Sequence, residues 1–177
     1  MHINRITLAL LLLSMASCGA IMDDLAPSGL DKRGSGGKLA PGQRAPDFSM
    51  PDIHGNMRTL SGELAGNRGA VIYFSMWCPV CDSHMQSILH GPLPKNPDVA
   101  FLVVDYVTSV VDGASKSATE AGYADGPFII LVDTTGQPTL AYGGTMGTTV
   151  VVDRTGVVRW IGDYKGEAEL EKALAIL

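Results

Sequence analysis

Two cysteines separated by two residues are the clearest chemical signal in this sequence. Cys78 and Cys81 form a Cys-Pro-Val-Cys motif that directly follows a run of apolar residues and a Trp. Thiols at this spacing can form and break a disulfide with each other, which is the chemistry of thiol–disulfide exchange. We therefore expect a redox pair in which one thiol attacks a disulfide and the other resolves the product.

The elements predicted around the motif give the two thiols different roles. Residues 70–75 are a continuous β-prone run typical of a strand buried on both faces, and residues 79–89 are compatible with a helix that has Pro79 in its first turn. Cys78 then lies at the helix N-terminus, where unpaired N–H groups and the helix dipole favour a thiolate. We therefore expect Cys78 to attack and Cys81 to resolve.

A cysteine pair can also be a structural disulfide or half of a zinc site. A bridge that closes so short a loop adds little stability through chain entropy. Zinc needs further ligands, and His54, His84 and His90 do not stand at a standard Cys/His spacing. The motif therefore favours redox chemistry, for which we expect neither a metal nor a cofactor.

The N-terminus is typical of an export signal. Residues 1–17 contain a basic start, a short apolar run and small residues before Cys18. The apolar run is far shorter than the roughly 18 to 20 residues that span a bilayer. Ala16-Ser17-Cys18 resembles a bacterial lipobox, which implies lipidation of Cys18; ordinary cleavage near Ala20 is the alternative. Both predict an exported protein of the periplasm or cell envelope, and lipidation adds a membrane anchor.

The rest of the chain is expected to be a linker and one α/β domain. Residues 18–44 are rich in Gly, Ser and Pro and predict a flexible tether, whereas residues 45–177 alternate short apolar runs with Gly, Asp and Pro. The 18 acidic residues outnumber the 13 basic ones, which argues against a nucleic-acid partner. We expect the domain to be a monomer.

The order of predicted elements indicates a central sheet flanked by helices. The strands at 70–75 and 99–104, joined by the helix that begins at Pro79, form a parallel β-α-β unit. The Asp-x-Thr-Gly segments at 133–136 and 153–156 are predicted to use the same turn chemistry. Further strands are expected at 128–132 and, as an antiparallel hairpin, at 148–152 and 157–161. Further helices are expected at 115–124, 138–142 and 167–176.

The strand, the Trp77–Cys81 motif, the helix and the later hairpin together resemble the thioredoxin superfamily, in particular its exported TlpA/ResA-like redoxins. The segment from Ala45 to Ser61 resembles the N-terminal β-hairpin of that branch. The resemblance implies a thioredoxin-like α/β fold, with a central mixed β-sheet flanked by helices, this hairpin and a central strand-helix insertion. It also implies thiol–disulfide exchange outside the cytoplasm, often as a reductant in cytochrome c or metalloprotein maturation. The implied partners are a protein disulfide or dithiol and a membrane thiol protein that donates electrons.

Three positions depart from the family pattern. Gly147, preceded by Met146, stands where the family has a proline that is usually cis and that faces the cysteines. His84 replaces a glutamate, and it is either a proton-exchanging group near neutral pH or a histidine of the helix surface. Ile72 replaces the buried aspartate of thioredoxin, so the proton relay of thioredoxin is not copied.

The resemblance also suggests which residues accompany the thiols. Trp77, Pro79 and His84 are expected to support the chemistry. The docking surface for the substrate is expected to include Trp77 with Tyr73, Met146 and Gly147.

Two other functions remain open. A peroxiredoxin-like thiol peroxidase would use Cys81 as its nucleophile, but it would need Thr or Ser where Cys78 stands and a proline shortly upstream. A copper-binding assembly chaperone would use a wider Cys spacing and a distant histidine, whereas no histidine follows His90 here. Copper bound by the two thiolates alone is the form of this alternative that the sequence allows.

Overall fold

Two continuous apolar runs of the sequence pair with each other at the centre of a β-sheet. The computed structural model describes residues 39–177. Strands β3 (Gly69–Ser75) and β4 (Val99–Asp105) are parallel, and every residue in both is buried. The five strands have the order β5-β4-β3-β6-β7, with β5 (Ile129–Val132) parallel to β4 and with β6 (Thr148–Asp153) and β7 (Val158–Asp163) as an antiparallel pair. The predicted mixed sheet is thus confirmed.

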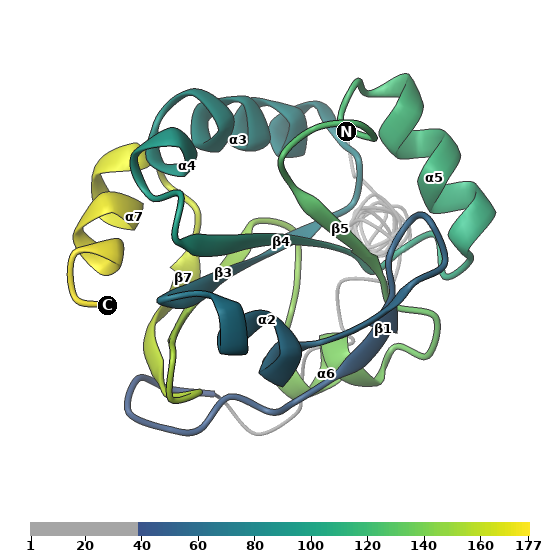
Figure 1. Cartoon of the computed structure of the whole chain (residues 1–177). Helices are drawn as coiled ribbons and strands as arrows, with labels where there is room; N and C mark the ends of the chain where they lie inside the picture. The colour runs from purple at the N-terminus through teal and green to yellow at the C-terminus, as the bar shows by residue number, and fades with distance from the viewer. Residues whose placement is uncertain (1–38) are drawn as a thin grey trace, which may run out of the picture. The chain divides into compact units, whose positions relative to one another are not determined.

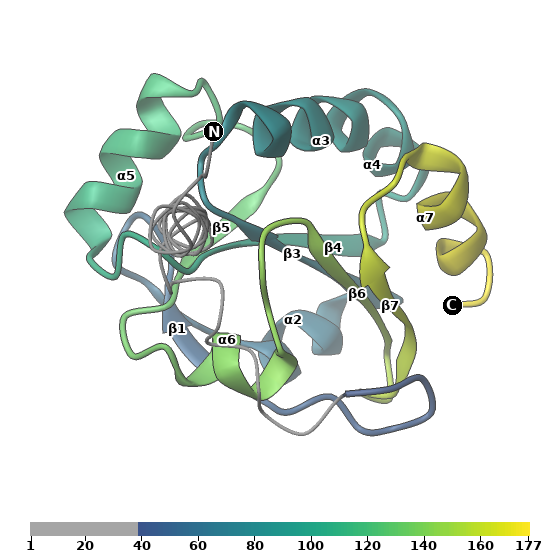
Figure 2. The same cartoon turned by 180° about the vertical axis from the view of Figure 1, so that it is seen from behind.

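Helices cover both faces of this sheet. They are α2 (Leu60–Gly66), α3 (Pro79–His90), α4 (Pro92–Lys95), α5 (Val111–Glu120), α6 (Gln137–Tyr142) and α7 (Glu167–Leu174). One core cluster joins Val71 and Tyr73 of β3 to α3, α5 and α7, and another joins Ile72 and Phe74 to α2 and α6. Figure 1 shows α3 above the sheet with α2 and α6 below it, and Figure 2 shows the same layers from behind.

A small hairpin precedes the sheet, as the resemblance implies. Strands β1 (Ser49–Pro51) and β2 (Met57–Thr59) are antiparallel, with Met50 opposite Arg58. Met50 is buried in the core cluster of α2 and α6, so the hairpin is packed against the domain. The central insertion corresponds to α5 and β5, which lie in the chain between β4 and the β6–β7 hairpin.

The helices differ from the prediction in two ways. Helix α5 covers Val111–Glu120 rather than 115–124, because Gly122 adopts a left-handed backbone (φ 80°) that ends the helix. Helices α2 and α4 were not predicted. Thr59 is the N-cap residue of helix α2, and its hydroxyl accepts a hydrogen bond from the N–H of Gly62 at 3.0 Å. Helix α4 follows the predicted stop at Gly91, with Pro92 in its first turn.

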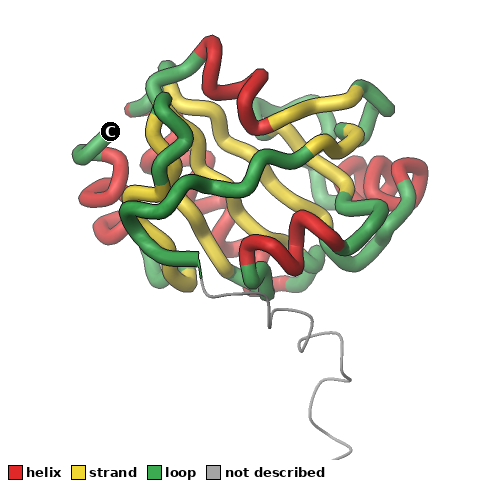
Figure 3. The backbone as a smooth tube through the Cα atoms, turned by 90° about the horizontal axis from the view of Figure 1, so that it is seen from below, coloured by secondary structure: helices red, strands yellow, loops and turns green. Residues whose placement is uncertain are grey.

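The packed part of the chain begins before the predicted boundary at Ala45. Leu39 is buried, and the N–H of Gly42 donates to the Val158 carbonyl at 2.8 Å. The N–H of Ala45 donates to the Gly156 carbonyl at 2.8 Å, so residues 39–44 run along the end of the β6–β7 hairpin (Figure 3). These residues therefore do not belong to a free tether, because two long-range backbone contacts hold them.

Several predictions for the N-terminus concern residues that the structure does not describe. The signal segment 1–17, the lipidation site Cys18 and residues 18–38 of the tether all lie outside the described residues. Between residues 39 and 177, no helix is both long enough and apolar enough to cross a membrane.

The two Asp-x-Thr-Gly segments use the same turn chemistry, as predicted. Asp133 Oδ1 accepts from the N–H of Thr135 at 3.2 Å and the N–H of Gly136 at 2.7 Å. Asp153 Oδ1 accepts from the N–H of Thr155 at 2.8 Å and the N–H of Val157 at 3.0 Å. Each buried carboxylate therefore pairs the amide groups of the turn that follows its strand.

Asp133→Asn is expected to destabilise the domain by about 1 to 3 kcal/mol. Asp133 Oδ1 accepts from the N–H of Gly136, and Asp133 Oδ2 accepts from the N–H of Thr139 at 2.8 Å. In asparagine one of these oxygens becomes an NH2 group, which would face a backbone N–H donor and lose that hydrogen bond. Urea unfolding measures the change, with the exposed Asp112→Asn as the matched control. Equal stability of the two variants would contradict this role of Asp133.

Candidate active site

The two thiols of the motif lie next to each other at the start of α3. Cys78 is the N-cap residue of the helix, and Cys81 is in its first turn. Both cysteines are free thiols, and their Sγ atoms are 2.9 Å apart. Cys81 has no solvent exposure, whereas Cys78 is partly exposed. A partner can therefore reach Cys78 first.

The helix N-terminus distributes its hydrogen bonds over both thiols. The N–H of Cys81 donates to Cys78 Sγ at 3.3 Å, but burial and the neighbouring Cys81 raise the pKa of Cys78. Burial also opposes ionisation of Cys81, yet hydrogen bonds from Cys78, the Met76 N–H and the Ser75 hydroxyl lower its pKa. The expected preference for a Cys78 thiolate is therefore not supported by these pKa directions. Access, rather than acidity, distinguishes Cys78.

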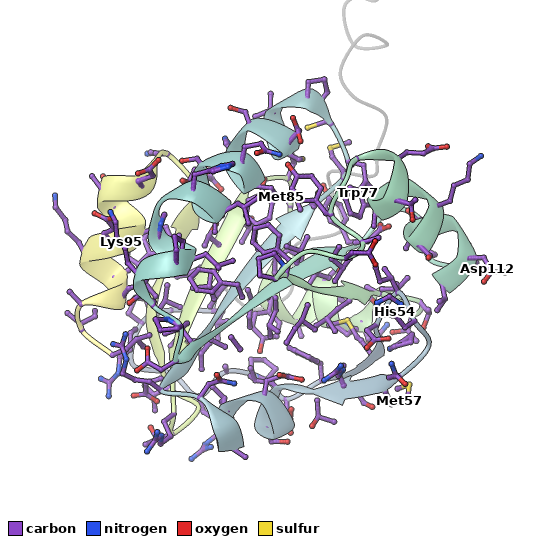
Figure 4. The ribbon with its side chains drawn as sticks, turned by 45° about the horizontal axis from the view of Figure 1, so that its top comes forward. His54, Met57, Trp77, Met85, Lys95 and Asp112 are labelled. Atoms are coloured by element: carbon purple, nitrogen blue, oxygen red, sulfur yellow. The ribbon has the colours of Figure 1, made fainter. Side chains whose placement is uncertain are left out.

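Trp77 is held in a left-handed backbone conformation by the neighbouring strand. Its φ is 57°, a conformation that costs a residue with a side chain about 1 to 2 kcal/mol. Its indole Nε1 donates to Asp105 Oδ2 at 2.7 Å. Asp105 is fully buried at the end of β4, opposite Ser75, and it also accepts from the N–H of Val107 at 3.0 Å. Figure 4 shows Trp77 between the start of α3 and α5.

Asp105 is a site residue that the sequence analysis missed. The signal for it was its position at the carboxyl end of β4, which is parallel to β3, the strand that leads to the motif. Parallel neighbours end at the same edge of a sheet, so Asp105 had to lie near Trp77.

His84 faces the interior rather than the helix surface. Its Nδ1 is 3.0 Å from the Tyr73 hydroxyl, and its ring centre is 4.8 Å from that of Tyr164. Partial burial lowers the pKa of His84 below its ordinary value, because the imidazolium form loses hydration. Tyr164 was not among the predicted site residues, and its distance from the motif in the chain explains why.

Tyr73 does not lie on a docking surface. Its exposed fraction is 1%, because it is in the central strand and its ring packs in the core under α3. The prediction that Tyr73 contacts substrate is therefore wrong. Burial, and then the nearby Cys81 and Cys78 thiols, raise the pKa of its hydroxyl, which is 3.0 Å from His84 Nδ1.

Gly147 lies opposite α3, as the family pattern implies for this position. Its φ is 84°, and no peptide bond within residues 39–177 is cis. Its N–H donates to the Phe74 carbonyl at 3.1 Å, and its carbonyl accepts from the N–H of Tyr164 at 2.8 Å. A Cβ at this position would lie 3.7 Å from the His84 ring. Two backbone hydrogen bonds thus hold the segment that a proline holds in the family.

Exposed apolar side chains surround the partly exposed thiol. Met76 and Val80 expose 38% and 49% of their surfaces, on either side of Cys78 in the chain. Pro79 is also exposed, and Trp77 and Met146 are partly exposed. Such a surface can contact an apolar segment of another protein.

The other two histidines of the domain do not join the thiols. His54 is exposed in the β1–β2 hairpin, away from Trp77 in Figure 4. His90 is at the last turn of α3, where its Nδ1 is 2.8 Å from the Gln86 carbonyl. In the part of the chain that the structure describes, no three His, Cys, Asp or Glu side chains form a group suited to a metal ion.

Comparison with known proteins gives one family and many similar folds. The Redoxin family model matches residues 40–177. A putative thiol:disulfide interchange protein DsbE from Chlorobium tepidum has 23% identity and a TM-score of 0.64 over 78% of this chain and 98% of its own. A thiol-disulfide oxidoreductase from Bacteroides fragilis has 22% identity and a TM-score of 0.61 over 76% of this chain and 100% of its own.

The same fold also occurs in a peroxidase-type protein. Peroxidoxin BcpB from Mycobacterium tuberculosis has 24% identity and a TM-score of 0.60 over 77% of this chain and 95% of its own. No curated protein matches the chain. At these identities the solved structures establish a shared fold, so the choice of reaction depends on the site.

Gly147→Pro is expected to destabilise the domain by about 3 kcal/mol or more, although proline is the usual family residue. A proline ring cannot adopt a φ of 84°, and it removes the N–H that donates to Phe74. Gly147→Ala is the matched control; the left-handed backbone alone costs it about 1 to 2 kcal/mol, and its methyl group fits beside His84. Urea unfolding compares them, and a proline variant as stable as the alanine variant would refute the argument.

Proposed function

The chain belongs to the Redoxin family, and we propose that it is an exported thiol–disulfide oxidoreductase with Cys78 as the attacking thiol and Cys81 as the resolving thiol. The observation that carries this assignment is the pair of free thiols 2.9 Å apart, of which only Cys78 has access to the surface. A large partner can form a bond with Cys78, and Cys81 is then already within reach of that bond.

The proposed reaction transfers two electrons from the cysteine pair to a substrate disulfide. The Cys78 thiolate attacks one sulfur of the disulfide, which forms a mixed disulfide and releases the other sulfur as a thiolate. Cys81 then loses its proton and attacks Cys78 Sγ, which releases the second substrate thiolate and leaves a Cys78–Cys81 disulfide. The chemistry needs no cofactor, and a dithiol donor restores the reduced pair.

The substrate is proposed to be a protein disulfide, in a reductive step of cytochrome c or metalloprotein maturation. The exposed Met76, Pro79 and Val80, with partly exposed Trp77 and Met146, support docking of a polypeptide next to Cys78. Gly147 is buried, and its N–H and carbonyl are paired with Phe74 and Tyr164, so it supports this region and does not contact the substrate itself. Export and a lipid anchor at Cys18 belong to the same proposal, because both would place the domain near a membrane thiol donor.

Exchange is preferred over a peroxidase reaction because of the burial of Cys81. In a peroxiredoxin-like reaction Cys81 would have to meet peroxide first, yet it has no solvent exposure. Copper binding would rely on the two thiolates, and the mixed-disulfide experiment below separates that function from exchange.

Cys78→Ala is expected to abolish disulfide reduction, whereas Cys81→Ala should retain attack and accumulate a mixed disulfide. The reason is that removal of Cys81 leaves the first bond with nothing to resolve it. Insulin reduction measures turnover, and non-reducing electrophoresis with mass spectrometry detects the trapped species. Peroxide consumption by the Cys78→Ala variant would instead identify a peroxidase, and normal turnover by the Cys81→Ala variant would refute the mechanism.

The reduction potential of the pair should be near or below that of thioredoxin, about −270 mV, if the protein acts as a reductant. Equilibration of residues 39–177 with dithiothreitol, read by thiol alkylation, gives this value. A potential that approaches about −120 mV would identify an oxidant of folding proteins instead.

A further inference from the structure

A cleft of about 430 Å³ lies at the end of the sheet opposite the thiols. Its lining residues are Arg44, Ser61, Leu64, Ala65, Arg154, Thr155 and Gly156. Gly69, the first residue of β3, pairs with Asp153, which directly precedes the β6–β7 turn, whereas Cys78 follows the other end of β3. Strand β3 has seven residues, so about 20 Å of strand separates the cleft from the thiols. In Figure 2 the β6–β7 turn is at the bottom of the molecule and α3 is at the top.

Two arginines give this cleft a positive charge. Arg44 and Arg154 are both exposed, and neither forms an ion pair with any described residue. Arg44 Nη1 lies against the β6–β7 turn, where a Cβ added to Gly156 would be 3.2 Å from it. Arg154 Nε donates to the Asn67 carbonyl at 3.3 Å, and its two terminal nitrogens have no acceptor among the described residues. Guanidinium groups with free N–H donors are well suited to bind phosphate.

The carboxylates next to the cleft in the sequence are already engaged. Asp153 Oδ2 accepts from Arg159 Nε at 2.6 Å, and Glu63 of α2 pairs with an arginine of β2 at 3.4 Å. Asp47 Oδ1 accepts from the N–H of Ser61 at 3.1 Å. The two guanidinium groups of the cleft are therefore available to an external anion.

The sequence before the cleft continues the positive charge. Lys32, Arg33 and Lys38 precede Arg44, and no Asp or Glu stands between residues 32 and 46. The whole chain has a net charge of −5, so this segment reverses the sign of the protein locally. Clusters of Lys and Arg next to a point of membrane attachment are typical of segments that bind anionic lipids.

We propose that Arg44 and Arg154 bind phosphate headgroups of an anionic phospholipid membrane. The inference goes beyond the exchange reaction and does not depend on it. A lipid anchor at Cys18 would bring the same end of the domain to a membrane, but the contact proposed here does not require that anchor.

The course of the chain favours a membrane over a soluble phosphate compound as the occupant. Residues 1–38 join the domain at this end, because Leu39 is buried and the N–H of Gly42 donates to the Val158 carbonyl just after the β6–β7 turn. The cleft is thus next to the point where the N-terminal segment leaves the domain. A soluble ligand would gain nothing from this proximity, whereas a membrane held by the N-terminal segment would meet the cleft at a high effective concentration.

The proposed contact determines which way the thiols face. Because Cys78 is at the opposite end of β3, a domain bound to lipid through Arg44 and Arg154 presents Cys78 away from the membrane. Its apolar surroundings, Met76 and Val80, then remain open to a protein partner.

The test is co-sedimentation of the full chain with vesicles of phosphatidylcholine alone and with vesicles of phosphatidylcholine and phosphatidylglycerol in equal parts. The difference between the two isolates the charge-dependent contact, since any apolar contribution of the N-terminus is common to both. The protein should prefer the anionic vesicles, and added salt should weaken that preference. Arg44→Gln with Arg154→Gln should lower the affinity for anionic vesicles about 30-fold, because each basic group near an anionic leaflet contributes about fivefold.

Lys116→Gln with Lys165→Gln is the matched control, because it removes two exposed positive charges elsewhere on the domain. It should bind anionic vesicles as the wild type does, and urea unfolding should show the same stability for both double variants. An equal loss of affinity in the two double variants would overturn the site, because net charge alone would then explain the binding. Binding of inorganic phosphate with no preference for anionic vesicles would assign the cleft to a soluble anion and overturn the membrane contact.

The orientation has its own measurement. Alkylation of Cys78 by iodoacetamide, read by mass spectrometry of its peptide, should proceed on anionic vesicles at the rate seen in solution. Protection of Cys78 by the vesicles would place the membrane on the apolar surface around the thiol and overturn the proposed contact. Neither result depends on whether the cysteine pair reduces disulfides, so the exchange function is tested separately.

Discussion

Burial of β3 on both faces is the constraint on which the rest of the structure depends. This strand lies between β4 and β6, and its carboxyl end delivers the chain to Trp77 and Cys78. Its last residue pairs with Asp105 of β4, which holds the Trp77 indole, and the Phe74 carbonyl accepts the N–H of Gly147. The motif, the tryptophan and the loop opposite the cysteines are thus positioned by the same few residues, so a shift of β3 would disturb all three.

The alternation of side chains along β3 assigns chemistry to one face and packing to the other. Tyr73 points to the face of α3, where its hydroxyl is 3.0 Å from His84 Nδ1, whereas Phe74 points to the face of α2 and α6. A polar group in such a dry place is stable only with partners, and its hydrogen bonds are stronger there than in water. The burial that removes Tyr73 from substrate contact therefore also strengthens its hydrogen bond with His84.

Two of the three departures from the family pattern lie close together in space. Gly147 replaces the proline and His84 replaces the glutamate, and a Cβ on Gly147 would lie 3.7 Å from the His84 ring. Tyr164 connects the two, because its N–H binds the Gly147 carbonyl and its ring lies against His84. The loop is therefore held by a left-handed glycine and backbone hydrogen bonds rather than by a locked ring, and the imidazole occupies the space beside it.

Local patterns in the sequence determined the thiol motif, the β-α-β unit around it, the β6–β7 hairpin and the two aspartate turns. Each depends on residues within a few positions of one another, so periodicity and turn chemistry predict them. Only the tertiary structure decided the burial of Tyr73, the contact of Asp105 with Trp77, the place of Tyr164 beside His84, and the packing of residues 39–44 on the hairpin. These features join segments far apart in the chain, and which side chains meet there depends on the register and layering of the whole sheet.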